Sequence, residues 1–351
     1  MAAGAVAAAR GTLLGLILGD AVGATGGSVP ERGILPATSG GQLACFTVEG
    51  LIRADVRGAL RGIGHTPSMV WQAYGRWAAL QGVVPMDEAK AARWPDGWLA
   101  DVSILREPRG TAPATVAALR GRPSEAASGA GSGATSGATA RKSLGPRAVT
   151  RVLPVGLYAR AGEAAQLAAE VAAITHRDEA VVAAAIGASA VQRLSEGETL
   201  ARAMATAEEH GARANAGAGL SALTAAIQAG RSAPREAAQL TRFTPDDAAA
   251  SVLAGGVYVA LSFPEPDSIQ EALLFAARAN DGGHVATVAG TLLGAAHGPD
   301  ALPVEWLSRL ELVWIADTLA RDLVRQMTKT PAGTEYAEAT DPHWWRRYPG
   351  W

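Results

Sequence analysis

Residues 11–24 read GTLLGLILGDAVGA, and this stretch decides the fold class. Its apolar residues and the spacing of its small residues predict a helix, with Gly15 and Gly19 on a face that another helix can approach closely. The whole chain has this character: 48% of its 351 residues are hydrophobic, largely Ala, Val and Leu, and only 5% are aromatic. The sequence therefore predicts an all-α protein whose core consists of closely packed helices.

Further helical patterns are separated by short polar, Gly or Pro breaks. They cover residues 67–84, 164–174, 179–194, 199–210, 217–229, 246–261, 268–279, 287–296 and 311–327. Two of these helices have capping signals at their starts. Thr244 stands before Pro245 and two acidic residues, and Ser268 is followed three positions later by Glu271.

Two segments bear on the domain organisation. Residues 121–142 are rich in Gly, Ser and Ala, a composition that predicts a flexible loop. A linker between two domains is the alternative, but we expect one domain over residues 1–340 with this loop inside it. Residues 341–351, DPHWWRRYPGW, are dense in aromatic side chains. We expect them to form a C-terminal tail packed on the domain, with a surface for base stacking or for a protein partner as the alternative.

Charge and apolarity limit the partners and the location. The formal net charge of -2 and the lack of a Lys/Arg run argue against nucleic acid as a partner. The apolar run after Arg10 is short and is interrupted by Asp20, so we expect no membrane segment and a cytoplasmic protein. The single cysteine, Cys45, excludes an intramolecular disulfide, and we expect it to be a buried thiol rather than a nucleophile.

Four motifs follow one another along the chain. They are the GxxxGxxxGDAxG pattern at 11–23, TVEG at 47–50, SLGPRAVTRVLPVGL at 143–157 with Thr175-His176 after it, and NDGGHVATVAGTLLGAAHG at 280–298. Together they resemble the ADP-ribosylglycohydrolase family, which includes the hydrolase that acts on dinitrogen reductase. The family patterns after the first are Thr-Asp-Asp-Thr, Ser-Asn-Gly-x-x-Met-Arg-x-x-Pro and Gly-Gly-Asp-x-Asp-Thr. The resemblance implies a single compact orthogonal helical bundle.

The resemblance also implies a reaction, hydrolysis of an N- or O-glycosidic bond between ADP-ribose and an amino-acid side chain or related acceptor. In the family a binuclear magnesium site positions the ribose and the attacking water. When the family's motifs are matched to this sequence, the remnant of the metal site consists of Thr47, Glu49 and Thr287. Three positions that hold Asp in the family are here occupied by Val48, His284 and Ala286.

Magnesium needs oxygen ligands, normally with one or more carboxylates. The missing aspartates therefore lead us to expect no cofactor, or weakly bound Mg²⁺. A single zinc or manganese ion held by His284, Glu49 and the threonines is the alternative. A lone His in a glycine turn more often makes hydrogen bonds, and we favour that role.

The positions that hold the ligand in the family are better preserved. The resemblance places Ser143 and Gly145 at the diphosphate, with Arg147 adding charge and His176 close to the phosphates. In the alternative interpretation Ser143 and Gly145 only close a loop, and His176 ends a helix. We expect Arg151 to be an internal ion-pair or helix-terminus residue.

Three functions remain open on the sequence. The first is a catalytically impaired family member that binds ADP-ribose, a related nucleotide or an ADP-ribosylated protein. The second is a hydrolase or lyase with altered chemistry, in which Glu49 and His284 are the catalytic residues. The third is a protein-interaction scaffold that binds a partner through the C-terminal tail.

Overall fold

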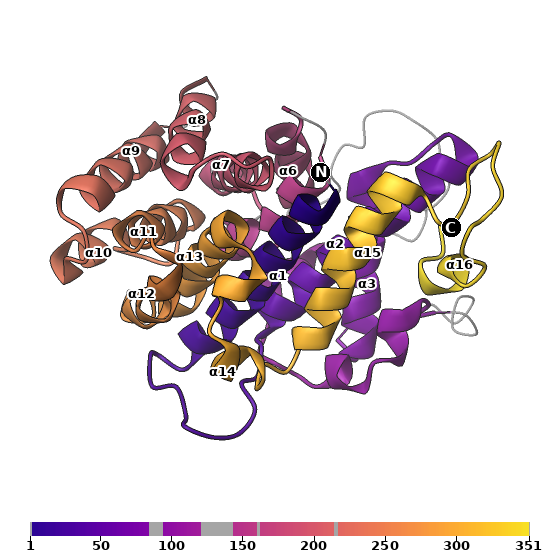
Figure 1. Ribbon diagram of the computed structural model, residues 1–351, viewed down its shortest axis with the longest axis horizontal. Helices are drawn as coiled ribbons and strands as arrows, with labels where there is room; N and C mark the ends of the chain where they lie inside the picture. Colours follow the sequence, from indigo (N-terminus) through magenta and orange to yellow (C-terminus); the bar gives the residue numbers. More distant parts are fainter. Residues whose placement is uncertain (1, 84–93, 121–142, 160–161, 214–216, 351) are drawn as a thin grey trace.

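Helix α1 (Ala2–Ala24) runs through the middle of the molecule, and the other helices pack around it (Figure 1). The structure is a computed structural model that describes residues 2–83, 94–120, 143–159, 162–213 and 217–350. Within these ranges there is no β-strand, only isolated β-bridges such as Ser143 with His176. The all-α prediction is confirmed. The loop predicted at 121–142 lies outside the described residues.

The N-terminal half contributes α2 (Ser39–Arg61), α3 (Thr66–Leu80), η1 (Trp98–Asp101), η2 (Ser103–Arg106), α4 (Pro113–Arg120), α5 (Arg147–Thr150), η4 (Leu153–Leu157) and α6 (Ala164–Ala172). The second half contributes α7 (Asp178–Ser195), α8 (Leu200–Arg213), α9 (Gly217–Ser232), α10 (Ala237–Phe243), α11 (Ala249–Ser262), η5 (Pro266–Ser268) and α12 (Ile269–Ala276). The chain continues through α13 (Gly282–His297), η6 (Pro299–Ala301), α14 (Val304–Leu307), α15 (Val313–Lys329) and α16 (Trp344–Arg347).

The closest helix contact joins α1 to α13. A Cβ atom added to Gly15 would lie 2.1 Å from the carbonyl oxygen of Gly290, and one added to Gly294 would lie 2.1 Å from that of Gly11. Both distances are far below van der Waals contact, so the two backbones touch directly. The small-residue face predicted for α1 is confirmed, and its partner is the helix that begins with the fourth motif.

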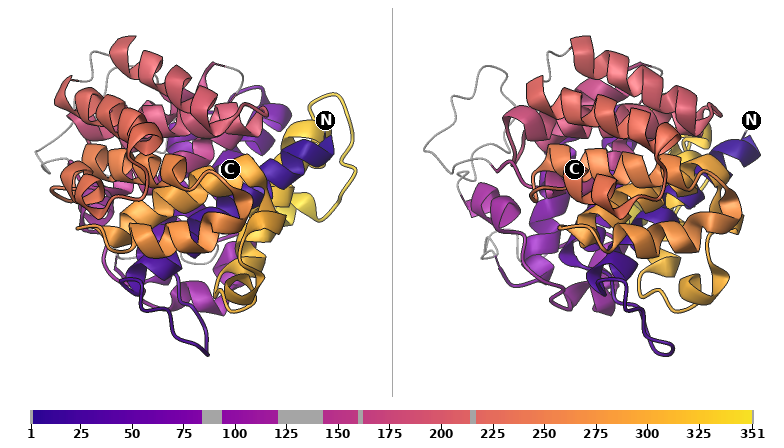
Figure 2. Two further views of the ribbon diagram at one scale, coloured as in Figure 1. Left: turned by 60° about the vertical axis from the view of Figure 1, so that its left-hand side comes forward. Right: turned by 90° about the vertical axis from the view of Figure 1, so that its left-hand side faces the viewer.

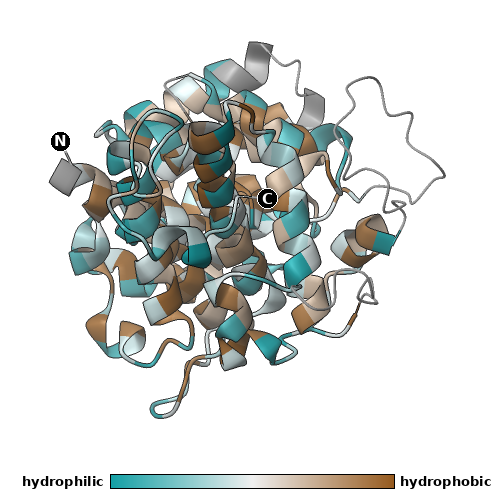
Figure 3. Cartoon of the chain, turned by 90° about the vertical axis from the view of Figure 1, so that its right-hand side faces the viewer, coloured by the Kyte–Doolittle hydropathy of each residue, from teal (hydrophilic) through white to brown (hydrophobic). Residues whose placement is uncertain are grey.

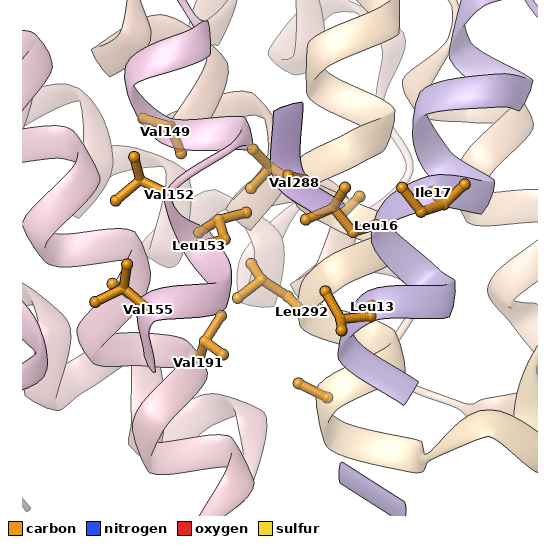
Figure 4. Close-up of a cluster of buried hydrophobic side chains, with 14 of the residues drawn as sticks. Leu13, Leu16, Ile17, Val149, Val152, Leu153, Val155, Val191, Val288 and Leu292 are labelled. Carbon is orange, nitrogen blue, oxygen red and sulfur yellow. The ribbon is translucent and has the colours of Figure 1, made fainter. Parts of the chain in front are cut away.

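Larger side chains flank this backbone contact and form the core. Leu13 and Leu16 of α1 meet Val288 and Leu292 of α13. Figure 4 shows this group facing apolar residues of α5, of η4 and the residue before it, and of α7, namely Val149, Val152, Leu153, Val155 and Val191. The third sequence motif is therefore packed against the α1–α13 pair.

The remaining helices divide into two groups. In Figures 1 and 2, α7 to α12 lie to one side of α1, and α2, α3, α15 and the C-terminal segment lie to the other. Figure 3 views the molecule from the second side, where hydrophilic and hydrophobic residues alternate along the helices. Such alternation is expected where one face of a helix is buried and the other faces water.

The C-terminal tail is held against α15. Trp344 and Tyr348 are buried, and the Tyr348 hydroxyl donates to Asp322 of α15 at 2.6 Å. Arg347 lies 2.8 Å from the same carboxylate. The dense aromatic residues in this part of the tail are therefore used for packing on the domain.

Helix α1 also has the length and apolarity of a membrane-spanning helix between Gly4 and Ala24. Most of it is buried by its neighbours within the protein. Its apolar composition is thus accounted for by its central position in the core.

The predicted helices are present, most with ends shifted by a few residues, although α1 begins at Ala2 rather than at residue 11. The sequence predicted no counterpart of α2, α4, α5, α10, α14 or α16. Neither predicted hydroxyl makes a capping hydrogen bond, although Ser268 does occupy the N-cap position of α12. Thr244 follows α10 and donates its hydroxyl back to the Leu240 carbonyl at 2.8 Å, and α11 begins only at Ala249. Ser268 donates to the Glu265 carbonyl at 2.7 Å instead of capping α12. In both places the hydroxyl bonds backward along the chain, a local competition that sequence patterns do not resolve.

The α1–α13 contact makes a testable prediction. Gly15→Ala should lower the free energy of unfolding by at least about 2 kcal/mol, because the added methyl meets backbone that can move only if the helices separate. Urea denaturation measures this difference.

Gly58→Ala in α2 is the matched control, because a Cβ there meets nothing within 4 Å. Since Ala favours the helix over Gly, this variant should gain up to about 1 kcal/mol. Equal stability changes in the two variants would contradict the backbone contact.

Candidate functional site

The candidate site is built around Asp20, near the end of α1. Its carboxylate is buried and accepts hydrogen bonds from the Thr38 backbone N–H and hydroxyl, both at 2.6 Å. Burial raises the pKa of Asp20, and the Thr38 bonds together with the charges of His284 and Arg147 act in the opposite direction. Asp20 thus joins α1 to the start of α2 and lies near the start of α13.

The start of α2 is shaped to fit this carboxylate. Thr38 is the N-cap, and its hydroxyl oxygen accepts from the Gly40 N–H at 2.9 Å. A Cβ added to Gly41 would lie 2.7 Å from an Asp20 carboxylate oxygen. Glycine at this position therefore lets Asp20 sit directly beside the helix.

Arg147, the first residue of α5, brings a positive charge to the same place. Its Nη2 donates to the Ser39 hydroxyl at 3.2 Å, whereas its Nε is buried and has no hydrogen-bond acceptor. Burial lowers the pKa of Arg147, and the nearby Asp20 and Asp281 carboxylates oppose that shift. The guanidinium thus interacts with both acids, and its Nε–H has no acceptor.

His284 lies in the first turn of α13 and pairs with Asp281, the residue before the helix. Its Nδ1 is 2.8 and 2.9 Å from the two Asp281 carboxylate oxygens. An ionised carboxylate only accepts, so the proton belongs on Nδ1 and the other ring nitrogen is left for other contacts. The hydrogen-bonding role expected for His284 agrees with this arrangement.

Of these groups, Arg147, Asp281 and His284 border a cleft with a volume of about 490 Å³. Its lining residues come from the starts of α5, α11 and α13 and are Pro146, Arg147, Pro245, Asp246, Asp247, Asn280, Asp281 and His284. A cleft of this size with few aromatic walls and many polar groups suits a polar small molecule.

The Ser143–Gly145 segment lies behind Arg147. The Ser143 hydroxyl accepts from the Gly145 N–H at 2.9 Å, and the Leu144 carbonyl accepts from the Ala249 N–H at 3.0 Å. The Ser143 backbone also bridges to the segment around His176. Ser143, Gly145, Arg147 and His176 are thus neighbours along one connected stretch, although only Arg147 lines the cleft.

His176 is buried and its Nδ1 lies 2.7 Å from the Thr175 hydroxyl. Burial, aided by the charges of Arg151 and Arg147, lowers the pKa of His176 to about 3. The imidazole is therefore neutral at ordinary pH and does not supply a positive charge to a phosphate.

Arg151 is internal, as expected, but it has no carboxylate partner among the described contacts. Its guanidinium donates to the hydroxyls of Thr115 and Thr175 and lies 4.5 Å from the centre of the Tyr74 ring. Of the two roles expected for Arg151, the helix terminus is confirmed, because it is the C-cap of α5. Hydroxyls and an aromatic face take the place of an ion pair.

Thr47 and Glu49, expected as remnant metal ligands, are not brought to His284. They lie inside α2, and Glu49 is eight residues beyond Gly41, about 12 Å along the helix axis. The Thr47 hydroxyl bonds the Leu43 carbonyl and the Tyr74 hydroxyl. Glu49 is buried in ion pairs with Arg53 and Arg76.

The fourth motif offers little more to a metal. The Thr287 hydroxyl donates to the Gly283 carbonyl at 2.8 Å, and Ala286 is buried beneath α1. Among the described residues no group of three or more His, Cys, Asp or Glu side chains is arranged to hold a metal ion. The residues present therefore do not fit a binuclear magnesium centre.

Cys45 is also accounted for. It is buried in α2, and burial next to Asp20 raises the pKa of its thiol to about 12. The expectation of a buried thiol is confirmed.

Sequence reasoning missed the residues that converge at Asp20. Asp20 entered only as part of the first motif, and Thr38 and Ser39 were not singled out. A signal was present, because Thr38-Ser39-Gly40-Gly41 combines an N-cap residue with small residues at the start of an apolar stretch.

Comparison with known proteins agrees with the fold and the motifs. The model of the ADP-ribosylglycohydrolase family matches residues 2–333. A solved structure described as an "ADP-ribosylglycohydrolase-related protein complex" is similar, with a TM-score of 0.58, 21% sequence identity, and coverage of 92% of this chain and 98% of that chain. The helical bundle expected from the motifs is thereby confirmed. No curated protein matches the sequence significantly.

The ion pairs of Glu49 predict a structural role for this carboxylate. Glu49→Gln should lower the free energy of unfolding by about 3 kcal/mol or more, because two buried guanidinium groups lose their shared counter-charge. Glu271→Gln, which breaks an exposed pair with Arg235, is the control and should change stability by less than about 0.5 kcal/mol. Chemical denaturation compares the two, and similar small losses would restore Glu49 as a candidate functional acid.

The neutral state of His176 predicts a dependence of stability on pH. Below pH 6.5 the unfolded chain takes up a proton at His176 that the folded protein, with a pKa of about 3, does not. The free energy of unfolding therefore falls as the pH falls. Between pH 7 and pH 5 the wild type should lose about 2 kcal/mol more of it than His176→Asn does. Urea titrations of both proteins at several pH values measure the difference, and parallel pH profiles would show that His176 titrates normally.

Proposed function

The chain belongs to the ADP-ribosylglycohydrolase family, and on this premise we propose that it binds ADP-ribose or a related nucleotide, free or attached to a protein, without the family's magnesium-dependent hydrolysis. The observation that carries the proposal is the contrast at the cleft. An open polar cleft of about 490 Å³ is present, but among the described residues no group of three or more His, Cys, Asp or Glu side chains is arranged to hold a metal ion.

The residues at the starts of both helices near Asp20 support this proposal. At the start of α2, Thr38-Ser39-Gly40-Gly41 fits the place of the family's Thr-Asp-Asp-Thr better than residues 47–50 do, because it lies against Asp20. In this register both aspartates are replaced, by Ser39 and Gly40. At the start of α13, His284 and Ala286 stand in the place of the other two.

The remaining carboxylates at this position have other partners. Asp20 is bonded to Thr38, and Asp281 to His284. A divalent ion with near-octahedral oxygen coordination would need these groups to be free and additional anionic ligands beside them. We therefore derive no catalytic step through a metal ion.

The cleft itself supports binding of a nucleotide-sized ligand. Its volume lies in the range of small-molecule sites, and its walls offer carboxylates, an amide, an imidazole and a guanidinium. Carboxylates accept from ribose hydroxyls, whereas the guanidinium donates to phosphate oxygens. Both kinds of group are present in ADP-ribose.

A second candidate is an enzyme with altered chemistry. The His284–Asp281 pair faces the cleft, and a carboxylate that orients an imidazole is the usual arrangement of a general base. Glu49 takes no part in this version, because it is buried elsewhere. A scaffold acting through the tail has no comparable support, since Trp344 and Tyr348 are covered by the domain.

The first experiment is a calorimetric titration of the purified protein with ADP-ribose, in magnesium-containing buffer and again with a chelator. We expect binding in both, with affinities that agree within about threefold (about 0.7 kcal/mol). Hydrolysis of an ADP-ribosylated protein, followed by chromatography of the released ADP-ribose, should be absent under both conditions.

Two results would contradict the proposal. The absence of heat at millimolar ADP-ribose in both buffers would exclude the nucleotide as ligand. Hydrolysis that depends on magnesium would show that the metal site is intact, whereas hydrolysis that resists the chelator would favour the second candidate.

A further inference from the structure

We propose that Arg147 takes the electrostatic place of the divalent ions, and that it binds the phosphate of a phosphorylated polyol without any metal. The inference rests on the proposed function in that a nucleotide is one of its ligands. It adds the residue that recognises the ligand and a wider class of ligands. ADP-ribose and simple sugar phosphates both belong to that class.

The first observation concerns the N–H groups of the Arg147 guanidinium. A guanidinium has five N–H donors, and the described contacts use one, from Nη2 to Ser39. The Nε is buried without an acceptor, although buried polar groups are nearly always paired. Arg147 lines the cleft, so an oxyanion there can accept from those guanidinium N–H groups that face it.

The surroundings hold this charge in position. Asp20 and Asp281 lie close enough to oppose the effect of burial on the Arg147 pKa. Ser39, at the start of α2, fixes one end of the guanidinium. Arg147 is a cation that belongs to the chain itself and acts on both acids, so no bound metal ion is needed to balance their charge.

The acidic side chains of the cleft indicate which groups the ligand needs besides a phosphate. Asp246 is used by the Ala248 N–H and the Ser251 hydroxyl, and Asp281 is used by His284. Asp247 also lines the cleft and would repel a bare anion. It would accept from a sugar hydroxyl, so a ligand with both a phosphate and hydroxyls is favoured over inorganic phosphate.

Helix α13 adds a smaller contribution. It is 16 residues long, its first turn borders the cleft, and no side chain caps its N–H groups. The partial positive charge at this end favours an anion beside Arg147.

The test is calorimetric binding of ribose 5-phosphate and ADP-ribose to the wild type, Arg147→Met and Arg147→Lys, each with a chelator present. We expect Arg147→Met to weaken both ligands at least tenfold, and Arg147→Lys to give an intermediate loss because it keeps the charge but not the planar donors. Ribose without phosphate and inorganic phosphate should each bind the wild type at least tenfold more weakly than ribose 5-phosphate. Removing the chelator and adding magnesium should change the wild-type affinity by less than threefold.

Arg202→Met is the matched control, since it removes the same charge from an exposed position on α8 and should leave binding unchanged. Thermal denaturation of each variant verifies that it is folded. Binding that survives in Arg147→Met, or that the chelator abolishes in the wild type, would overturn the inference while leaving nucleotide binding as a property of the chain. If ribose 5-phosphate binds through Arg147 but ADP-ribose does not, the proposed function fails and the inference stands. If neither ligand binds at millimolar concentration, both fail.

Discussion

The direct backbone contact between α1 and α13 is the constraint on which the rest of the structure depends. Where a carbonyl oxygen fills the space of a missing Cβ, one helix cannot turn or slide on the other without placing a side chain in that space. The register of the contact sets Gly19 against Ala286 and Gly23 against Gly283. Asp20, between these two glycines, is thereby held beside the first turn of α13. The packing of the core and the geometry of the candidate site are consequences of the same interaction.

That register explains why the electrostatics of the site can differ from those of the family while the fold does not. The backbone contact needs small residues, and it is insensitive to whether the following turns carry Asp, Ser or His. With carboxylates at the starts of α2 and α13, the site would attract cations. With Ser39, Gly40 and His284 there instead, the starts of both helices lack those anions, and Arg147 adds a full positive charge next to them.

Much of the fold could be predicted from the sequence, because α1 and α13 are marked by small residues at helical spacing and by apolar flanks. Helix α2 was missed because its first residues, Ser39 to Gly41, are poor helix formers and because Glu49 and Arg53 interrupt its apolar pattern. The contact between Thr38 and Asp20 also joins segments that are distant in the sequence, and only the fold shows it. A two-residue side-chain contact between distant segments, such as Arg147 with Ser39, has no periodic signal in the sequence.

Glu49 shows how a residue of catalytic type can serve the site indirectly. Its carboxylate neutralises Arg53 and Arg76 within the protein, and Arg53 in turn binds Asp96 and lies 3.4 Å from the Pro349 carbonyl. Because a buried guanidinium is costly unless it is paired, the acid is required for these contacts to form at all. The cluster thus ties the C-terminal tail to the middle of α2, the helix whose first turn holds Asp20 and Ser39. From the sequence alone, Glu49 was expected to be a catalytic residue. Its ion pairs instead favour a structural role, in which it holds α2, and with it the start of that helix, in position.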